Sequence, residues 1–283
     1  MQILILVFKI IVISLVIGLV VISLGNITFN KKIEEEVNQL FVDNYKSSWH
    51  INEHELKSLP EPVQKWLRYS GVNGSKKIYS VRLKQEGMIR TEKDQPWMSA
   101  RAEQYFTVDK PGFVWKVKVR MAPFLYFNGR DRYYKGKGNM LIKLMALVPV
   151  VNAEGKEIDQ GTLLRYLGEI VWFPQAALSN YIEWEEVDSN SARAIMSYGG
   201  LSASAIFNFN HKGEVISYTC KRYMSRAGGA TLEDYLVLVE DYKDRGGFKI
   251  PTRAEAIWRL DTGDFSYYKF KVTDIEYNKL TIY

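Results

Sequence analysis

The sequence predicts a mainly β protein: an antiparallel curved sheet, or half-barrel, with an inserted helical element and an N-terminal transmembrane helix before it. Three observations predict this fold. Aromatic residues make up 13% of the 283 residues, which favours strands. Many runs alternate apolar and polar residues at spacings of about 8 to 12 residues, as in a meandering antiparallel sheet. Residues 3–24 are apolar almost throughout, which is typical of a membrane span.

The N-terminal segment predicts a membrane anchor over residues 1–28. A helix of residues 3–24 would be about 33 Å long, enough to cross a hydrocarbon core of about 30 Å. Lys9 lies near one end, where its amine can reach the membrane surface. A cleaved signal peptide stays the alternative, although Ser23-Leu24-Gly25 matches the Ala-x-Ala cleavage pattern poorly. We expect a single-pass membrane protein with the bulk of the chain outside the cytoplasm.

Residues 29–72 predict a helical connector. Ile33, Val37, Leu40 and Phe41 recur at helical spacing from Asn30 to about Tyr45. A second helix fits residues 59–71, where Pro60 suits the first turn and Gly71 suits the end. Its buried face would hold Val63, Trp66 and Leu67.

Residues 73–283 predict the half-barrel itself. In the clearest strand, 113–121, apolar residues occupy one face, and Lys116, Lys118 and Arg120 occupy the other. Residues 210–213 and 261–264 have the composition of hairpin turns. Further strands fit residues 78–89, 100–108, 125–128, 132–135, 192–198, 202–208, 215–223, 236–242, 252–260 and 265–277.

A helical insertion over residues 139–180 interrupts this meander. Residues 140–151 are apolar on every side, which predicts a helix that is buried or lies in lipid. Residues 162–172 predict a second helix, with Leu163, Leu164 and Leu167 among its apolar residues. A twisted sheet curled around such helices would be a half-barrel with a hydrophobic interior.

The run Arg165-Tyr166-Leu167-x-Glu169-x-x-Trp172-x-Pro174 resembles a family of uncharacterised bacterial membrane-anchored proteins, described only as a domain of unknown function. The resemblance covers roughly residues 59–277 and implies no known activity. Its architecture is similar to the half-barrel carriers of lipoproteins, whose curved sheets hold acyl chains. Other shared features are Leu59-Pro60-x-Pro62-Val63, Asp131-Arg132-Tyr133, Gly138-Asn139-Met140, Arg222 and Trp258.

Arg165 and Glu169 are one helical turn apart and can therefore form an ion pair. Two interpretations stay open: a structural salt bridge that holds the inserted helix to the sheet, or a polar anchor in an apolar pocket for a headgroup or carboxylate. With Trp172 and with the shared Arg222 and Trp258, they form the predicted ligand-binding set.

A basic stretch predicts contact with anionic lipid. Residues 110–143 contain nine basic residues and one acidic residue, which accounts for the whole net charge of +6. Such charge attracts nucleic acid or anionic membranes, but a protein anchored outside the cytoplasm rarely meets nucleic acid. The predicted membrane-surface residues are Lys116, Lys118, Arg120 and Lys143.

The residues of the chain predict no catalytic group, cofactor or metal. The single cysteine, Cys220, excludes an internal disulfide framework and multi-cysteine metal sites. No P-loop, dinucleotide or serine-hydrolase motif occurs. We therefore expect a domain that binds a hydrophobic or lipidic ligand near the membrane. The alternatives are a cavity hydrolase, a metallohydrolase that uses His50 and His54, and a structural subunit docking on an envelope protein partner.

Overall fold

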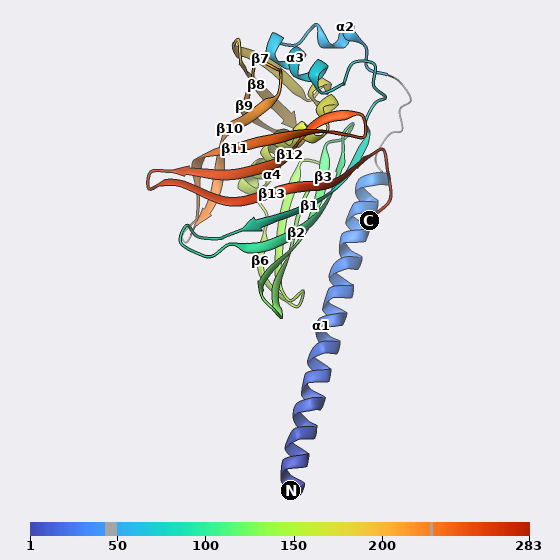
Figure 1. Cartoon of the computed structure of the whole chain (residues 1–283), viewed down its shortest axis with the longest axis vertical. Coiled ribbons are helices and arrows are strands. Elements are labelled where there is room, and N and C mark those ends of the chain that lie inside the picture. The colour runs from blue at the N-terminus through green and yellow to red at the C-terminus, as the bar shows by residue number, and fades with distance from the viewer. Residues whose placement is uncertain (43–49, 227–228) are drawn as a thin grey trace.

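The computed structural model describes residues 1–42, 50–226 and 229–283, which contain one 13-stranded antiparallel sheet (Figure 1). Its strand order is β6-β5-β4-β3-β2-β1-β13-β12-β11-β10-β9-β8-β7. The strands are β1 (Ser80–Ile89), β2 (Met98–Thr107), β3 (Gly112–Ala122), β4 (Leu125–Tyr134), β5 (Lys137–Leu144), β6 (Val148–Ala153), β7 (Ile182–Asp188), β8 (Ser191–Tyr198), β9 (Leu201–Phe209), β10 (Val215–Arg226), β11 (Gly229–Arg245), β12 (Phe248–Leu260) and β13 (Gly263–Tyr277). Two meanders, β1–β6 and β7–β13, join where β1 pairs with β13.

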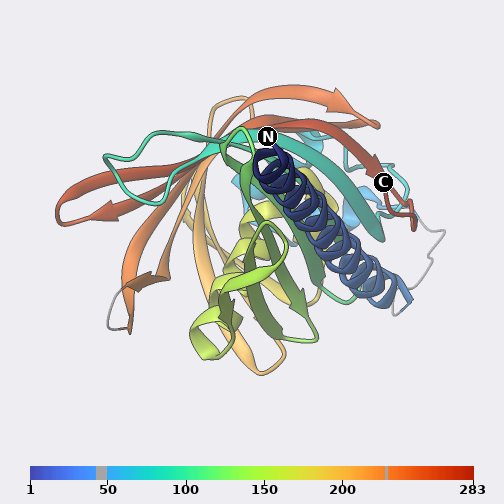
Figure 2. The ribbon, with the colours of Figure 1, turned by 90° about the horizontal axis from the view of Figure 1, so that it is seen from below.

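The helices lie on both faces of this sheet (Figure 2). They are α1 (Gln2–Val42), α2 (Glu53–Leu56), α3 (Glu61–Tyr69), α4 (Lys156–Glu169), and the short 3-10 helices η1 (Ile170–Trp172) and η2 (Pro174–Leu178). Helix α4 packs inside the curve of the sheet, where Leu163, Tyr166 and Leu167 are fully buried. The Tyr166 hydroxyl donates to the carbonyl of Thr107 on β2 at 2.9 Å, which ties α4 to the sheet.

Helix α1 is long and apolar enough to cross a membrane, by length and composition, and its apolar N-terminal part is exposed. Its C-terminal part packs on the outer face of the sheet. There Phe29, Ile33, Val37, Leu40 and Phe41 form a second apolar cluster with Tyr105, Val114 and Leu141. One helix therefore runs without a break from the apolar segment to the sheet.

Polar contacts also join α1 to the sheet. Glu36 forms an ion pair with Arg130 at 3.1 Å, and both side chains are buried. The Arg132 guanidinium donates to Gln39 at 2.7 Å. Arg130 and Arg132, two of the nine basic residues in the basic stretch, thus have partners on α1.

The predicted fold class is confirmed: a mainly β chain, an antiparallel curved sheet, an internal helical element and an N-terminal apolar helix. The predicted helix at 59–71 is α3, whose Val63, Trp66 and Leu67 are buried. The strand runs 125–128 and 132–135 are one strand, β4. Strand β7 was missed, because its sequence is mostly polar and exposed.

The prediction of a helix over residues 140–151 is wrong. These residues form the hairpin of β5 and β6, and the helical segment begins only at Lys156 instead of 139. The reason in β5 is burial on two faces: Leu141 packs under α1, whereas Met140 and Ile142 line the interior of the half-barrel. In β6, Val148 and Val150 are apolar but exposed. A strand covered on both faces is apolar throughout and cannot be distinguished from a buried helix by periodicity.

The connector predicted for residues 29–72 is likewise no separate unit. Its first helix is the continuation of α1, and its second, α3, contributes Trp66 to the main core, where Trp66 stacks on Phe207. Residues 43–49 of this connector lie outside the described residues.

Candidate functional site

A cavity of about 350 Å³ lies between α4 and the concave face of the sheet. Apolar and aromatic side chains form most of its wall, and they come from both meanders: Val117, Val119, Phe127 and Ile142 from one, Val237, Val239, Ala256 and Phe270 from the other. Its volume is within the range of about 300 to 1,000 Å³ typical of small-molecule pockets. The half-barrel therefore encloses space for an apolar ligand.

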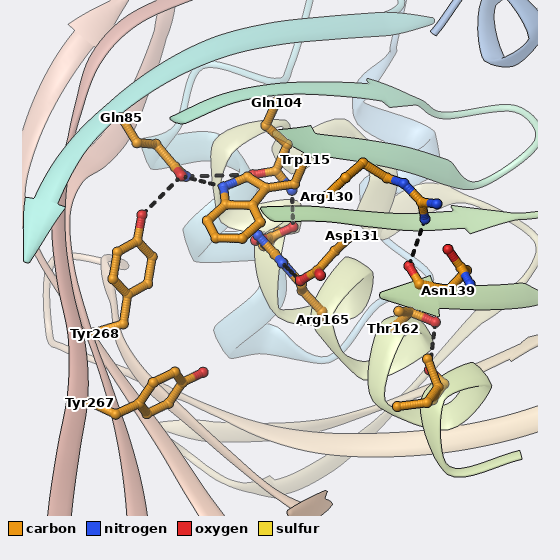
Figure 3. A network of polar contacts seen from close by, with 12 residues as sticks. Gln85, Gln104, Trp115, Arg130, Asp131, Asn139, Thr162, Arg165, Tyr267 and Tyr268 are labelled. Carbon is orange, nitrogen blue, oxygen red and sulfur yellow. Dashed lines mark hydrogen bonds and ion pairs between the residues drawn. The ribbon is translucent and has the colours of Figure 1, made fainter. Parts of the chain in front are cut away.

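A charged cluster lies at one side of this cavity (Figure 3). The Arg165 guanidinium pairs with Glu169 at 2.9 Å on α4 and with Asp131 at 2.6 Å on β4. The Gln104 amide of β2 donates to the second oxygen of Glu169 at 2.7 Å. Arg165 also lies 4.4 Å from the centre of the Trp115 ring. This cluster ties α4 to two strands, as the structural interpretation of the pair requires.

The Glu169 carboxyl is almost entirely buried in this cluster. Burial raises the pKa of Glu169 above its ordinary value, although the ion pair with Arg165 and the hydrogen bond from Gln104 act in the opposite direction. The cost of burying this carboxylate explains why it has partners on both oxygens.

Gln85 connects the charged cluster to the aromatic wall (Figure 3). Its carbonyl oxygen accepts from the Trp115 indole at 3.0 Å and from the Tyr268 hydroxyl at 3.4 Å. Its amide donates to Gln104 at 3.5 Å. The polar atoms on this side of the cavity are thus bonded to one another.

Arg222 of β10 lines the cavity without such partners. Among the described residues no carboxylate pairs with it, and no hydrogen bond holds its guanidinium. It lies 5.0 Å from the ring centre of Tyr235 and 5.8 Å from that of Trp258. A partly buried guanidinium between aromatic rings retains the capacity to bind an anion.

All five predicted ligand-binding residues, Arg165, Glu169, Trp172, Arg222 and Trp258, line this one cavity. Their role as ligand contacts stays a prediction. The sequence interpretation missed Gln85, Gln104 and Asp131. The available signal was a polar residue on the inward face of a strand, as at Gln104, which is fully buried between Ala102 and Phe106.

The predicted membrane-surface residues share the outer face of the sheet. Register places Lys118 opposite Asn128, and Asn128 opposite Lys143, so these three point the same way. Lys116 pairs with Glu103 at 3.6 Å, whereas Lys118 and Arg120 are exposed.

Two observations bear on the residues that the enzyme alternatives would use. No group of three or more His, Cys, Asp or Glu side chains among the described residues could hold a metal, and His50 precedes α2 while His54 lies within it. Burial raises the pKa of the Cys220 thiol to about 11, so this cavity residue is a poor nucleophile.

Solved structures with a similar arrangement are distant. A candidate outer-membrane lipoprotein-sorting protein domain from Vibrio parahaemolyticus has a TM-score of 0.44 and 10% identity, over 79% of this chain and 94% of its own. A LolA superfamily protein from Nitrosomonas europaea has a TM-score of 0.43 and 9% identity, over 78% and 93%. A β-barrel-like protein of unknown function from Brucella abortus has a TM-score of 0.31 and 7% identity, over 72% and 99%.

No curated protein sequence matches the chain. Residues 49–270 do match a family of unknown function, DUF6544, which spans the α2 and α3 helices, the insertion and nearly all of the sheet. The chain therefore belongs to this family of unknown function, DUF6544.

Proposed function

We propose that the half-barrel binds a lipidic ligand with an anionic headgroup, and that α1 anchors it to the membrane from which such a ligand comes. The observation that carries the proposal is Arg222, which has no carboxylate partner among the described residues and lies on the wall of a mostly apolar cavity. Burying a charge beside apolar surface is costly unless the charge has a partner. An anionic headgroup would supply that partner, and the apolar wall would receive the acyl chain.

The two arginines of the cavity would then have different roles. Arg165 already has two carboxylate partners, so it orients α4 and shapes the floor of the cavity. Arg222, with Trp258 and Tyr235 beside it, would contact the headgroup. Trp172 would add apolar wall, since its indole already donates to the carbonyl of Pro251 at 3.2 Å.

A binding titration tests this role. The purified full chain would be titrated with a fluorescent fatty acid and with the methyl ester of the same fatty acid. We expect the wild type to bind the carboxylate at least about tenfold more tightly, since a charge-assisted hydrogen bond contributes roughly 1.5 to 3 kcal/mol. Arg222→Met should remove this preference and leave ester binding nearly unchanged.

Arg259→Met is the matched control. Arg259 lies next to Trp258 on β12, but it is exposed and does not line the cavity. This variant should keep the preference for the carboxylate. Equal binding of acid and ester by the wild type would contradict the headgroup role of Arg222.

The proposed location is a single-pass anchor with the half-barrel outside the cytoplasm. A C-terminal reporter should then be accessible to external protease, while the protein resists extraction from membranes by carbonate. Release of a soluble form that begins near Asn26 would instead show that residues 1–25 are a signal peptide.

A further inference from the structure

Two hairpin tips of the half-barrel lie beside α1 where its apolar segment ends (Figures 1 and 2). We define the hairpin tips as residues 121–125, which include the turn from β3 to β4, and residues 147–150, which include the end of the turn after β5 and the start of β6. The Asn26 amide donates to the Tyr126 hydroxyl at 2.8 Å. At Gly25 an added Cβ would lie only 2.5 Å from Leu147, so the helix and the second tip are in close contact.

The position of the hairpin tips relative to α1 is fixed by the packing of α1 on the sheet. Helix α1 continues through Gly25 and Asn26 into the part that packs on the sheet through Phe29, Ile33 and Val37. Because the helix is unbroken, the level of a membrane crossed by residues 3–24 is also fixed relative to the tips. Phe124 lies two residues from Tyr126, on the side of the turn, so it lies at most about 7 Å further along α1 toward its N-terminus.

The hairpin tips expose large apolar side chains at this level. Phe124 is 88% exposed, Val148 56% and Val150 50%. Soluble proteins rarely expose apolar side chains in a contiguous group unless the group binds something. The exposed apolar half of α1 begins beside these tips. This half needs lipid around it if it spans a membrane.

Basic residues stand directly behind the hairpin tips. Lys118 and Arg120 on β3 are exposed on the outer face, with Lys143 on β5 in the same row as Lys118. Between residues 118 and 150 the one acidic residue is Asp131, which pairs with Arg165 at the cavity. Apolar residues at a tip with cations behind them match the interface of an anionic bilayer, where each nearby cation contributes about 1 kcal/mol.

We infer that the two hairpin tips insert into the surface of an anionic bilayer, the same bilayer that α1 crosses. This inference rests on the proposed membrane-spanning role of α1 and deepens the proposed function. The strands that form the tips also line the cavity through Val119, Phe127 and Ile142. The cavity wall therefore continues into the strands that would contact the bilayer, which is the proposed source of the ligand.

Depth-dependent quenching tests the insertion. The full chain, reconstituted in nanodiscs that contain phosphatidylglycerol, would carry an environment-sensitive fluorophore on Phe124→Cys or, separately, on Val148→Cys. Val187→Cys on β7 is the control, since Val187 is 47% exposed and β7 lies at the opposite end of the half-barrel (Figure 1). Labelling of the unsubstituted chain measures the background from Cys220.

We expect spin-labelled lipids to quench the fluorophore at 124 and at 148 several-fold more than at 187, with emission shifted to the blue. Equal quenching at all three sites in a protein that stays in the nanodisc would overturn the insertion and leave the ligand proposal standing. A chain that does not stay in the nanodisc would overturn both the anchor and the insertion. The fatty-acid titration separately decides the ligand.

Discussion

Asp131, Arg165 and Glu169 form an ionic cluster whose third member the sequence interpretation did not include. The spacing of Arg165 and Glu169 predicts their pairing, because residues four apart share a helix face. Asp131 lies 34 residues away on β4, and no local pattern reports that contact. Removing only the two helical residues would therefore leave Asp131 without its cation, at 20% exposure.

We predict that Arg165→Met lowers the free energy of unfolding by about 3 to 5 kcal/mol, because it removes the ion-pair partner of two mostly buried carboxylates. The triple variant Asp131→Asn, Arg165→Met, Glu169→Gln should recover most of this loss, since it removes all three charges together. Denaturant unfolding of the full chain in detergent measures both. A triple variant as unstable as the single one would show that the cluster contributes more than charge balance.

In contrast to the ionic cluster, we expect His50 and His54 to contribute almost nothing to stability. Both are exposed, and the paired contact of His50 with Lys76 is made by the backbone. We predict that the double change to Ala alters the free energy of unfolding by less than about 0.5 kcal/mol, as is usual at exposed sites. Elemental analysis of the wild type gives the decisive check: stoichiometric zinc that disappears in the double variant would contradict this prediction.

Among the elements, α1 combines two roles that the sequence presents as separate segments. The sequence predicts the apolar stretch and the amphipathic stretch well, because each has a clear pattern. Their continuity through Gly25 was not predicted, since glycine is a frequent helix terminator. In the structure the helix is unbroken at Gly25, where Leu147 packs so closely that a larger side chain would not fit.

Two truncations separate the roles of α1. A chain that starts at Gly25 should keep the thermal stability of the full chain, because the packed residues Phe29 to Phe41 remain. A chain that starts at His50 should melt at a lower temperature and aggregate, since Tyr105, Val114 and Leu141 would be exposed to water. Equal melting temperatures for the two truncations would show that α1 contributes nothing to the fold.

The wrong prediction of a helix at residues 140–151 follows from the position of β5 between α1 and the cavity. In β5, Leu141 packs under α1 on the outer face while Met140 and Ile142 line the cavity on the inner face, so β5 lacks the alternation that identifies other strands. Strand β3 was easy to predict because its outer face carries Lys116, Lys118 and Arg120. Sequence patterns report burial, and a strand buried on both faces loses its own signature.

At the scale of the whole molecule, the sheet curls around α4 but does not fill its interior with side chains. The sequence predicts a curved sheet around apolar helices, but the size of the remaining cavity depends on packing between strands as distant as β3 and β12, and no local pattern gives that. The proposed function requires that this cavity of about 350 Å³ holds a lipidic ligand.

Native mass spectrometry of the full chain, released from detergent, tests this claim most directly. Three proteins are compared: wild type, Ala256→Trp, which fills the cavity from β12, and Leu238→Trp, which adds the same side chain on the exposed outer face of β11. We predict that wild type and Leu238→Trp carry the added mass of an anionic lipid and that a folded Ala256→Trp protein carries none. A folded Ala256→Trp protein with its full lipid load, or a wild type without lipid, would contradict the claim.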